Sequence, residues 1–280
     1  MRLGQPSRTA MATANARAYH QLADEPRVFT DPLAVPLVGE SACRDNEFDR
    51  GADPVVVRRR RMFIAARSRF ADDTIAAAIA DGIGQVVILG AGMDTSAYRN
   101  PHPDVRFFEV DHPDTQAWKR QRIAEAGIAI PPTLTYAPID FEQRTLADGL
   151  AAAGLDRARG AVFVWLGVVM YLTSASVTDT LGFIATHGHR SVLVLDYLYP
   201  ELSLAPDVAA SRQDRVARVA DMGEPWQTYF TADEIRDQLL SLGFTDIEDH
   251  TAAALLAGYL GRPVPASSDT GVHMIRATTR

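Results

Sequence analysis

The chain has 280 residues, and 28 lysines and arginines face 35 aspartates and glutamates, which gives a formal net charge of −7 at pH 7. This acidic balance argues against a general nucleic-acid binder. The composition, 47% hydrophobic and 22% charged, is typical of a globular protein with a sizeable core. Cys43 is the only cysteine, which excludes an intrachain disulfide and a cysteine-rich metal site.

Two further features restrict the possible catalytic mechanisms and the expected cellular location. Lys119 is the only lysine, so no Walker A phosphate loop can be written and a Schiff-base mechanism would depend on this residue alone. The longest apolar run, residues 161–172, is too short to span a bilayer, and the first residues lack the apolar core of a signal peptide. We therefore expect a cytoplasmic protein that binds no membrane and no metal.

The first third of the chain has a helical pattern, and strands alternate with helices from Gln85 onward. The predicted helices span residues 10–22, 32–38, 54–80, 113–126, 144–153, 174–187 and 231–242, and a further short helix follows. The predicted strands span residues 86–89, 105–111, 134–140, 161–166, 191–197, 244–249 and 271–277.

This alternation predicts βαβ units and an α/β fold with a doubly wound, seven-stranded, mostly parallel sheet. The two C-terminal strands place an antiparallel strand at or near the sheet edge. No linker interrupts the chain, so we predict one domain over residues 1–280. Its parts are an N-terminal helical cap and lead-in helix (1–82), a ligand-binding core (83–199), a substrate-side insertion (200–230) and C-terminal strands that complete the sheet (231–280).

Ligands of doubly wound sheets bind beyond the carboxyl ends of the strands. The first strand is followed by Gly90-Ala91-Gly92, a turn that lets backbone N–H groups approach a ligand. Asp111 ends the second strand, where a carboxylate can accept hydrogen bonds from both ribose hydroxyls. Asp140 follows the third strand, where it would meet an adenine amino group. Thr95 replaces the third glycine of a dinucleotide loop, so the turn fits an adenosine ligand without phosphates, such as S-adenosylmethionine (SAM).

Several segments together resemble the leucine carboxyl methyltransferase family, including its bacterial branch of polyketide carboxyl methyltransferases and mycobacterial SAM-dependent methyltransferases. The resemblance extends from Ser7 to Trp226. The segments are Ala66-Arg67-Ser68-Arg69-Phe70, Val87 to Thr95, Phe108 to Pro113, and Trp165 to Leu172.

The resemblance implies a class I SAM-methyltransferase-like fold, with SAM as cofactor and S-adenosylhomocysteine as product. It implies that Arg67 holds the SAM carboxylate, that Gly90, Ala91 and Gly92 line the methionine and ribose, that Asp111 and His112 lie on the ribose side, and that Asp140 and Phe141 frame the adenine. Many family members have a glutamate where this chain has Leu166. The SAM ammonium would then need another partner, such as a backbone carbonyl of Gly90 or Leu166.

The acceptor side is predicted from residues outside this core. Asp196 and Tyr197, at the carboxyl end of the fifth strand, are the candidate catalytic groups, because none of the seven histidines is placed as a convincing base. The candidate substrate-binding residues are Arg8, Arg17, Tyr19, Met170, Tyr171, Trp226 and Tyr229.

The predicted function is a SAM-dependent O-methyltransferase that acts on a carboxylate, or a phenolic hydroxyl, of a small metabolite such as a polyketide or related natural product. One alternative is a nicotinamide-dependent oxidoreductase, against which Thr95 argues. Another is a non-catalytic SAM-binding protein. The sequence leaves open the identity of the acceptor, the methylated atom, the use of a base, and whether the protein is a monomer or a homodimer.

Overall fold

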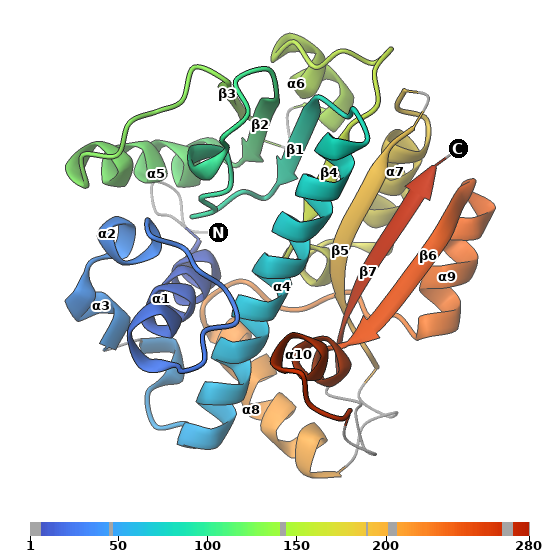
Figure 1. The fold of residues 1–280 in the computed structure, drawn as a ribbon. Coiled ribbons are helices and arrows are strands. Elements are labelled where there is room, and N and C mark those ends of the chain that lie inside the picture. The colour runs from blue at the N-terminus through green and yellow to red at the C-terminus, as the bar shows by residue number, and fades with distance from the viewer. Residues whose placement is uncertain are drawn as a thin grey trace.

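A seven-stranded sheet forms the centre of the computed structural model (Figure 1), which describes residues 7–44, 47–140, 144–188, 190–200, 206–264 and 271–279. The strand order is β3-β2-β1-β4-β5-β7-β6. The first five strands pair in parallel, and β7 pairs antiparallel with both β5 and β6. This confirms the predicted α/β class, the number of strands and the antiparallel strand near the edge.

The strand boundaries follow the sequence pattern closely. The strands are β1 (Gln85–Leu89), β2 (Arg106–Asp111), β3 (Leu134–Pro138), β4 (Val162–Trp165), β5 (Val192–Leu198), β6 (Phe244–Thr251) and β7 (Val272–Thr279).

Two of the helices were not predicted, α3 and α8. The helices are α1 (Arg8–Ala23), α2 (Ala34–Val38), α3 (Glu40–Arg44), α4 (Pro54–Ala80), α5 (Pro113–Glu125), α6 (Leu146–Ala152), α7 (Ser174–Ala185), α8 (Pro206–Asp221), α9 (Ala232–Ser241) and α10 (Ala252–Leu260). Short 3-10 turns lie at η1 (Glu47–Asp49), η2 (Ala97–Arg99) and η3 (Val169–Tyr171). No described helix is long and apolar enough to cross a bilayer.

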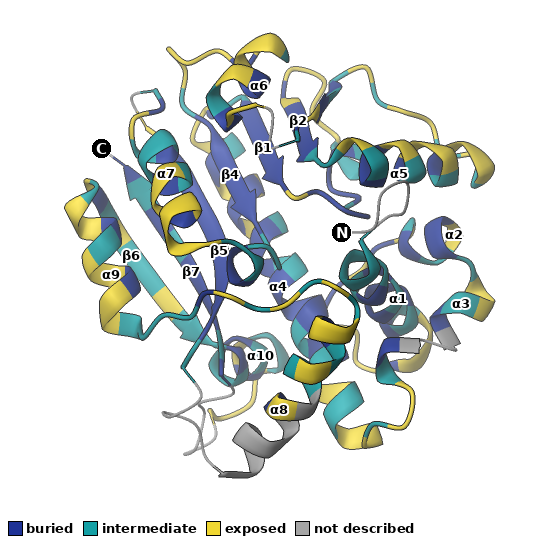
Figure 2. Cartoon of the chain, turned by 180° about the vertical axis from the view of Figure 1, so that it is seen from behind, coloured by how far each residue is buried: buried dark blue, intermediate teal, exposed yellow. Residues whose placement is uncertain are grey.

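The sheet is buried on both faces, which explains the continuous apolar runs of its central strands. Successive side chains of β1 point to opposite faces. Val86 and Ile88 pack with α4 and α10, whereas Val87 and Leu89 pack with α6, α7 and α9. The two views of the molecule show these helix layers on opposite sides of the dark, buried strands (Figure 2).

Local sequence signals fix the helix starts. Ser7 caps α1 by accepting a hydrogen bond from the N–H of Ala10, and Thr231 and Glu234 form the predicted capping box of α9. Pro54 occupies the first turn of α4, as predicted. The first helices form the predicted N-terminal cap, in which α1 packs against α2, α3 and α4.

The only lysine of the chain lies inside this fold rather than on its surface. Lys119 on α5 is 1% exposed, and its Nζ lies 2.7 Å from Oε2 of the fully buried Glu109 on β2. Burial raises the pKa of Glu109 above its ordinary value of 4.5, while the Lys119 ammonium opposes that rise. Removing one residue of this pair would leave the charge of the other buried without a partner, which would lower the free energy of unfolding.

We expect Lys119→Met to lower the free energy of unfolding by about 3–5 kcal/mol, because Glu109 is then buried without a partner. A carboxyl group with a raised pKa in the folded state binds protons that the unfolded state releases. The free energy of unfolding should therefore fall as the pH rises above 4.5, and more steeply in the variant than in the parent protein. Urea unfolding at several pH values measures both effects.

The matched control is the double variant Lys119→Met/Glu109→Gln, which contains neither charge. It should recover most of the lost stability and lose the steeper pH dependence. A double variant as unstable as Lys119→Met would mean that packing of the lysine side chain matters, and that its charge does not.

Candidate active site

A cavity of about 1380 Å³ lies at the carboxyl ends of the parallel strands. The described residues that line it come from the ends of β1, β2, β4 and β5, from the chain after β3, and from α1, α4, α7 and α8. The chain between α8 and α9 also lines the cavity and crosses the end of the sheet (Figure 2). This is the edge where the sequence predicts a ligand.

All the described residues that were predicted to bind the cofactor line this cavity. They are Arg67, Gly90, Ala91, Gly92, Asp111, His112, Asp140 and Leu166. Phe141, predicted to frame the adenine, lies outside the described residues.

The glycine turn after β1 is tied to the end of β2. Gly90 and Gly92 have φ values of +65° and +47°, a backbone conformation that favours glycine. The N–H of Gly92 donates to Oδ2 of Asp111 at 2.5 Å, and the N–H of His112 donates to Oδ1 at 2.7 Å. Two backbone donors therefore fix the carboxylate of Asp111 at the cavity wall. Burial raises the pKa of this carboxyl, and the two donors oppose that rise.

Both glycines also allow close packing. A Cβ on Gly90 would lie 2.3 Å from Cγ2 of Val168, and a Cβ on Gly92 would lie 3.2 Å from Cβ of Ala10 on α1. Gly92 thus lets the N-terminal helix pack against the turn, and Gly90 lets Val168 approach it. His112 caps α5, since its Nδ1 accepts from the N–H of Asp114 at 3.2 Å.

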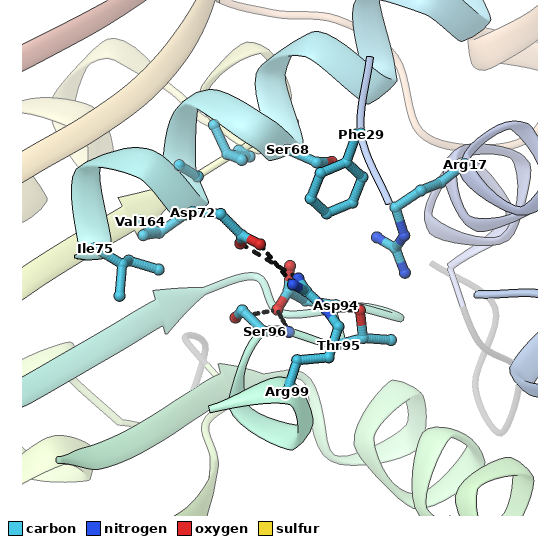
Figure 3. A pocket seen from close by; sticks show the side chains of 12 residues that line it. Arg17, Phe29, Ser68, Asp72, Ile75, Asp94, Thr95, Ser96, Arg99 and Val164 are labelled. Carbon is cyan, nitrogen blue, oxygen red and sulfur yellow. Dashed lines mark hydrogen bonds and ion pairs between the residues drawn. The ribbon is translucent and has the colours of Figure 1, made fainter. Parts of the chain in front are cut away.

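A polar network behind the turn explains Thr95, the residue at the place of a third dinucleotide glycine. Thr95 is 1% exposed, and its hydroxyl donates to Asp31 at 2.7 Å. In the small pocket behind the turn, Arg99 pairs with Asp72 at 2.5 Å, and Asp94 accepts from the N–H of Ser96 at 2.7 Å (Figure 3). The threonine therefore has a structural role here.

Arg67 and Asp196 form an ion pair that the sequence did not predict. Nη1 of Arg67 on α4 lies 2.6 Å from Oδ2 of Asp196 on β5, and Asp196 is 1% exposed. The other carboxylate oxygen accepts from the N–H of Gly167 at 2.5 Å. A Cβ on Gly167 would lie 3.1 Å from Nη1 and Nη2 of Arg67, so a glycine allows this approach. Asp196 therefore holds Arg67 in place.

The structure does not bring Tyr197 to the cavity beside Asp196. Neighbouring residues of a strand point to opposite faces, and the Tyr197 side chain is fully buried in the core under α7 and α9. Its hydroxyl donates to Oδ2 of Asp249 at 2.6 Å. The two predicted catalytic groups lie on opposite faces of the sheet, so only Asp196 lines the cavity.

The predicted acceptor residues divide into two groups. Arg17, Met170, Tyr171 and Trp226 line the cavity. Arg8, Tyr19 and Tyr229 are not among the described lining residues. The two tyrosine rings stack with arginines instead. The guanidinium of Arg61 lies 4.7 Å from the centre of the Tyr19 ring, and that of Arg212 lies 5.0 Å from the centre of the Tyr229 ring.

Arg17 has a structural role as well as a place in the wall. Its Nε lies 3.0 Å from Oδ2 of Asp31, and its Nη2 donates to the carbonyl of Met93 in the glycine turn. Arg17 thereby fixes α1 to the turn.

A second contact holds the start of α1 over the cavity. The carboxylate of Glu224 accepts from the hydroxyls of Ser7 and Thr9 and from the N–H of Arg8, the last at 3.0 Å. A negative charge at a helix N-terminus is favourable. Glu224 lies in the chain after α8, so this contact joins two distant segments, and sequence spacing gave no sign of it.

Comparison with known proteins agrees with this geometry. The family model of the leucine carboxyl methyltransferases matches residues 10–185. The chain belongs to the leucine carboxyl methyltransferase family. As a member of this family, it is a methyltransferase, and the oxidoreductase alternative has no support.

Relatives from this family match most of the chain. YktD of Bacillus subtilis, named as a candidate S-adenosyl-L-methionine-dependent methyltransferase, is 30% identical over 87% of this chain and 88% of its own length. A relative of the same description from Mycolicibacterium gilvum is 30% identical over 93% of this chain and 88% of its own length.

Solved structures share the fold at lower identity. A candidate methyltransferase from Thermobifida fusca has a TM-score of 0.59 at 18% identity and covers 99% of this chain and 96% of its own. A protein of the family DUF574 from Streptomyces avermitilis has a TM-score of 0.58 at 15% identity, over 95% of this chain and 97% of its own.

We expect Glu224→Ala to loosen the start of α1, because charge-assisted hydrogen bonds of about 1.5–3 kcal/mol are lost. Amide hydrogen exchange in the first turns of α1 should accelerate by about tenfold or more, with exchange in the sheet unchanged.

Glu234→Ala is the matched control, because Glu234 also accepts from a helix N-terminus, that of α9. It should accelerate exchange in α9 and leave α1 unaffected. Equal exchange of α1 in Glu224→Ala and the parent protein would contradict the anchoring role of Glu224.

Proposed function

We propose that this methyltransferase transfers the methyl group of SAM to a carboxylate oxygen of a small metabolite. The observation that carries the cofactor half is the Asp111 carboxylate, which two backbone N–H groups hold beside the glycine turn at the cavity wall. Relatives in the same family are named as SAM-dependent. The carboxylate half follows the family to which the chain belongs.

The lining residues fit the parts of SAM. Asp111 would accept hydrogen bonds from the ribose hydroxyls, and Asp140 would accept from the adenine amino group. Nη1 of Arg67 donates a hydrogen bond to Asp196. The other N–H groups of the guanidinium are further donors for the carboxylate of the methionine part of SAM. When bound, SAM supplies a methyl group on a positively charged sulfur, which is open to in-line attack.

Asp196 is also a candidate partner for the ammonium group of SAM. Trp165 on β4 pairs with Leu195 on β5, so Leu166 and Asp196 follow side by side on neighbouring strands. A carboxylate on β5 thus lies near the position where many family members have a glutamate. The sequence suggested only a backbone carbonyl as a substitute.

The chain's own contribution is to bind, orient and exclude water. Tyr171 lines the cavity, and burial raises the pKa of its hydroxyl, which makes it a poor base at neutral pH. The two carboxylate oxygens of Asp196 already accept hydrogen bonds from Arg67 and from the N–H of Gly167. These constraints favour an acceptor that is already ionised, as a carboxylic acid is at neutral pH, over a phenol.

We expect Asp111→Asn to weaken binding of S-adenosylhomocysteine by about 10–100-fold, since hydrogen bonds to a charged group contribute about 1.5–3 kcal/mol. Isothermal titration measures this. Asp81→Asn, which changes an exposed ion pair with Arg190, is the control and should bind like the parent protein. Unchanged affinity in Asp111→Asn would contradict the ribose assignment.

The acceptor is tested by incubating the protein with SAM and matched carboxylic acids, phenols and amines of the same carbon skeleton. Mass spectrometry should find methyl esters, which alkaline hydrolysis converts back to the acids. Methylated phenols or amines without esters would overturn the carboxylate assignment and leave the cofactor assignment intact.

A further inference from the structure

The part of the cavity between α4 and α8 contains a group of arginine side chains. Arg60 of α4 and Arg215 of α8 both line the cavity. The helix α8 lies next to the N-terminal half of α4 in both views (Figures 1 and 2). The predicted helices did not include α8, so the sequence did not single out Arg215.

The two arginines differ in their partners. Arg60 donates to both carboxylate oxygens of Asp49, from Nε at 3.0 Å and from Nη2 at 2.5 Å. Arg215 has neither a hydrogen bond nor an ion pair with any residue in the described part of the chain. Of the two arginines on this side of the cavity, Arg215 is therefore the one whose donors are open to a ligand.

The surroundings of Arg215 disfavour an isolated positive charge. Burial, together with the charges of Arg60, Arg212 and Arg59, lowers the pKa of Arg215 to about 10, and the carboxylate of Asp49 only partly opposes this. The guanidinium is still protonated at neutral pH, several pH units below that value. Arg215 is half-buried, and a cation in this position among other cations is stabilised by an anion beside it.

Apolar side chains also line the cavity near these arginines. They include Phe48, Phe63, Val219 and Trp226. A ligand that fits here therefore combines an anionic group with an apolar body. Guanidinium groups bind carboxylates through two parallel hydrogen bonds, which suits an organic acid.

We propose that Arg215 determines the acceptor specificity of this methyltransferase by binding a carboxylate group of an apolar organic acid. This inference rests on the proposed function, because it assigns the α8 side of the cavity to the acceptor. Arg60, held by Asp49, adds positive charge without being the main contact. Binding of the acid should leave the SAM side of the cavity unchanged.

Octanoate and octanamide are matched probes, with the same apolar chain and with or without the charge. Isothermal titration of the full chain should show octanoate binding at least tenfold more tightly than octanamide. Arg215→Gln should remove this preference by lowering octanoate affinity about tenfold, and Arg215→Lys should retain part of it. Octanamide affinity should stay the same in all three proteins.

Two controls separate charge from structure. Arg236→Gln changes an exposed arginine on α9 and should have no effect. Arg218→Gln removes the hydrogen bonds from α8 to the carbonyls of Phe48 and Arg50 and tests the docking of that helix. Equal affinities for the two probes, unchanged octanoate binding in Arg215→Gln, or an equal loss in Arg218→Gln would each overturn the proposal.

The same proteins are titrated separately with S-adenosylhomocysteine. We expect its affinity to be unchanged in Arg215→Gln. Loss of the octanoate preference with intact S-adenosylhomocysteine binding supports the role of Arg215. Absent S-adenosylhomocysteine binding in the parent protein would instead refute the proposed function, whatever the result with octanoate.

Discussion

The hydrogen bond from Gly92 in the glycine turn to the carboxylate of Asp111 is the contact on which the site depends. Parallel pairing of β1 with β2 brings Leu89 level with Val110, so the turn after β1 and the carboxylate after β2 emerge side by side. The N–H of Gly92 then reaches Asp111, and the open side of the turn receives α1 through Ala10. A side chain at Gly92 would disturb the cofactor wall and the contact with the N-terminal helix together, whereas a side chain at Gly90 would collide with Val168.

Buried ion pairs surround this contact and fix its orientation. Glu109 with Lys119, Asp196 with Arg67, and Asp31 with Arg17 are each nearly excluded from solvent. Such pairs contribute little net stability, but breaking one leaves a charge without solvent or partner. The strands and helices that carry these groups are therefore held in one relative arrangement. A cavity that must align a methyl donor and an acceptor requires this rigidity.

Sequence reasoning succeeded where the signal is local. Apolar runs, caps and glycine turns predicted the strands, most helices and the Asp111 position, because short-range rules govern them. The Arg67–Asp196 pair joins α4 to β5 across 129 positions, and no spacing predicts such a contact. Strand alternation alone would have separated Asp196 from Tyr197, since adjacent residues face opposite sides. The helix α8 was missed although the sequence carries its signals, Pro206 at the first position and Gly223 just past the end, because the segment after β5 was interpreted only as an insertion.

The two halves of the cavity are built under different constraints. The proposed cofactor half consists of strand ends and turns whose positions follow from the sheet register, so few residues there can change without disturbing the core. The proposed acceptor half consists of α1, α8 and the chain after α8. Arg212 of α8 donates to the carbonyl of Tyr199 directly after β5, and Glu224 joins the chain after α8 to the start of α1. Substitutions on α8 can alter the charge and shape of that wall at little cost to the fold. A family built in this way can keep one methyl donor while its acceptors diverge, and the residue to compare first among relatives is the one that occupies the place of Arg215.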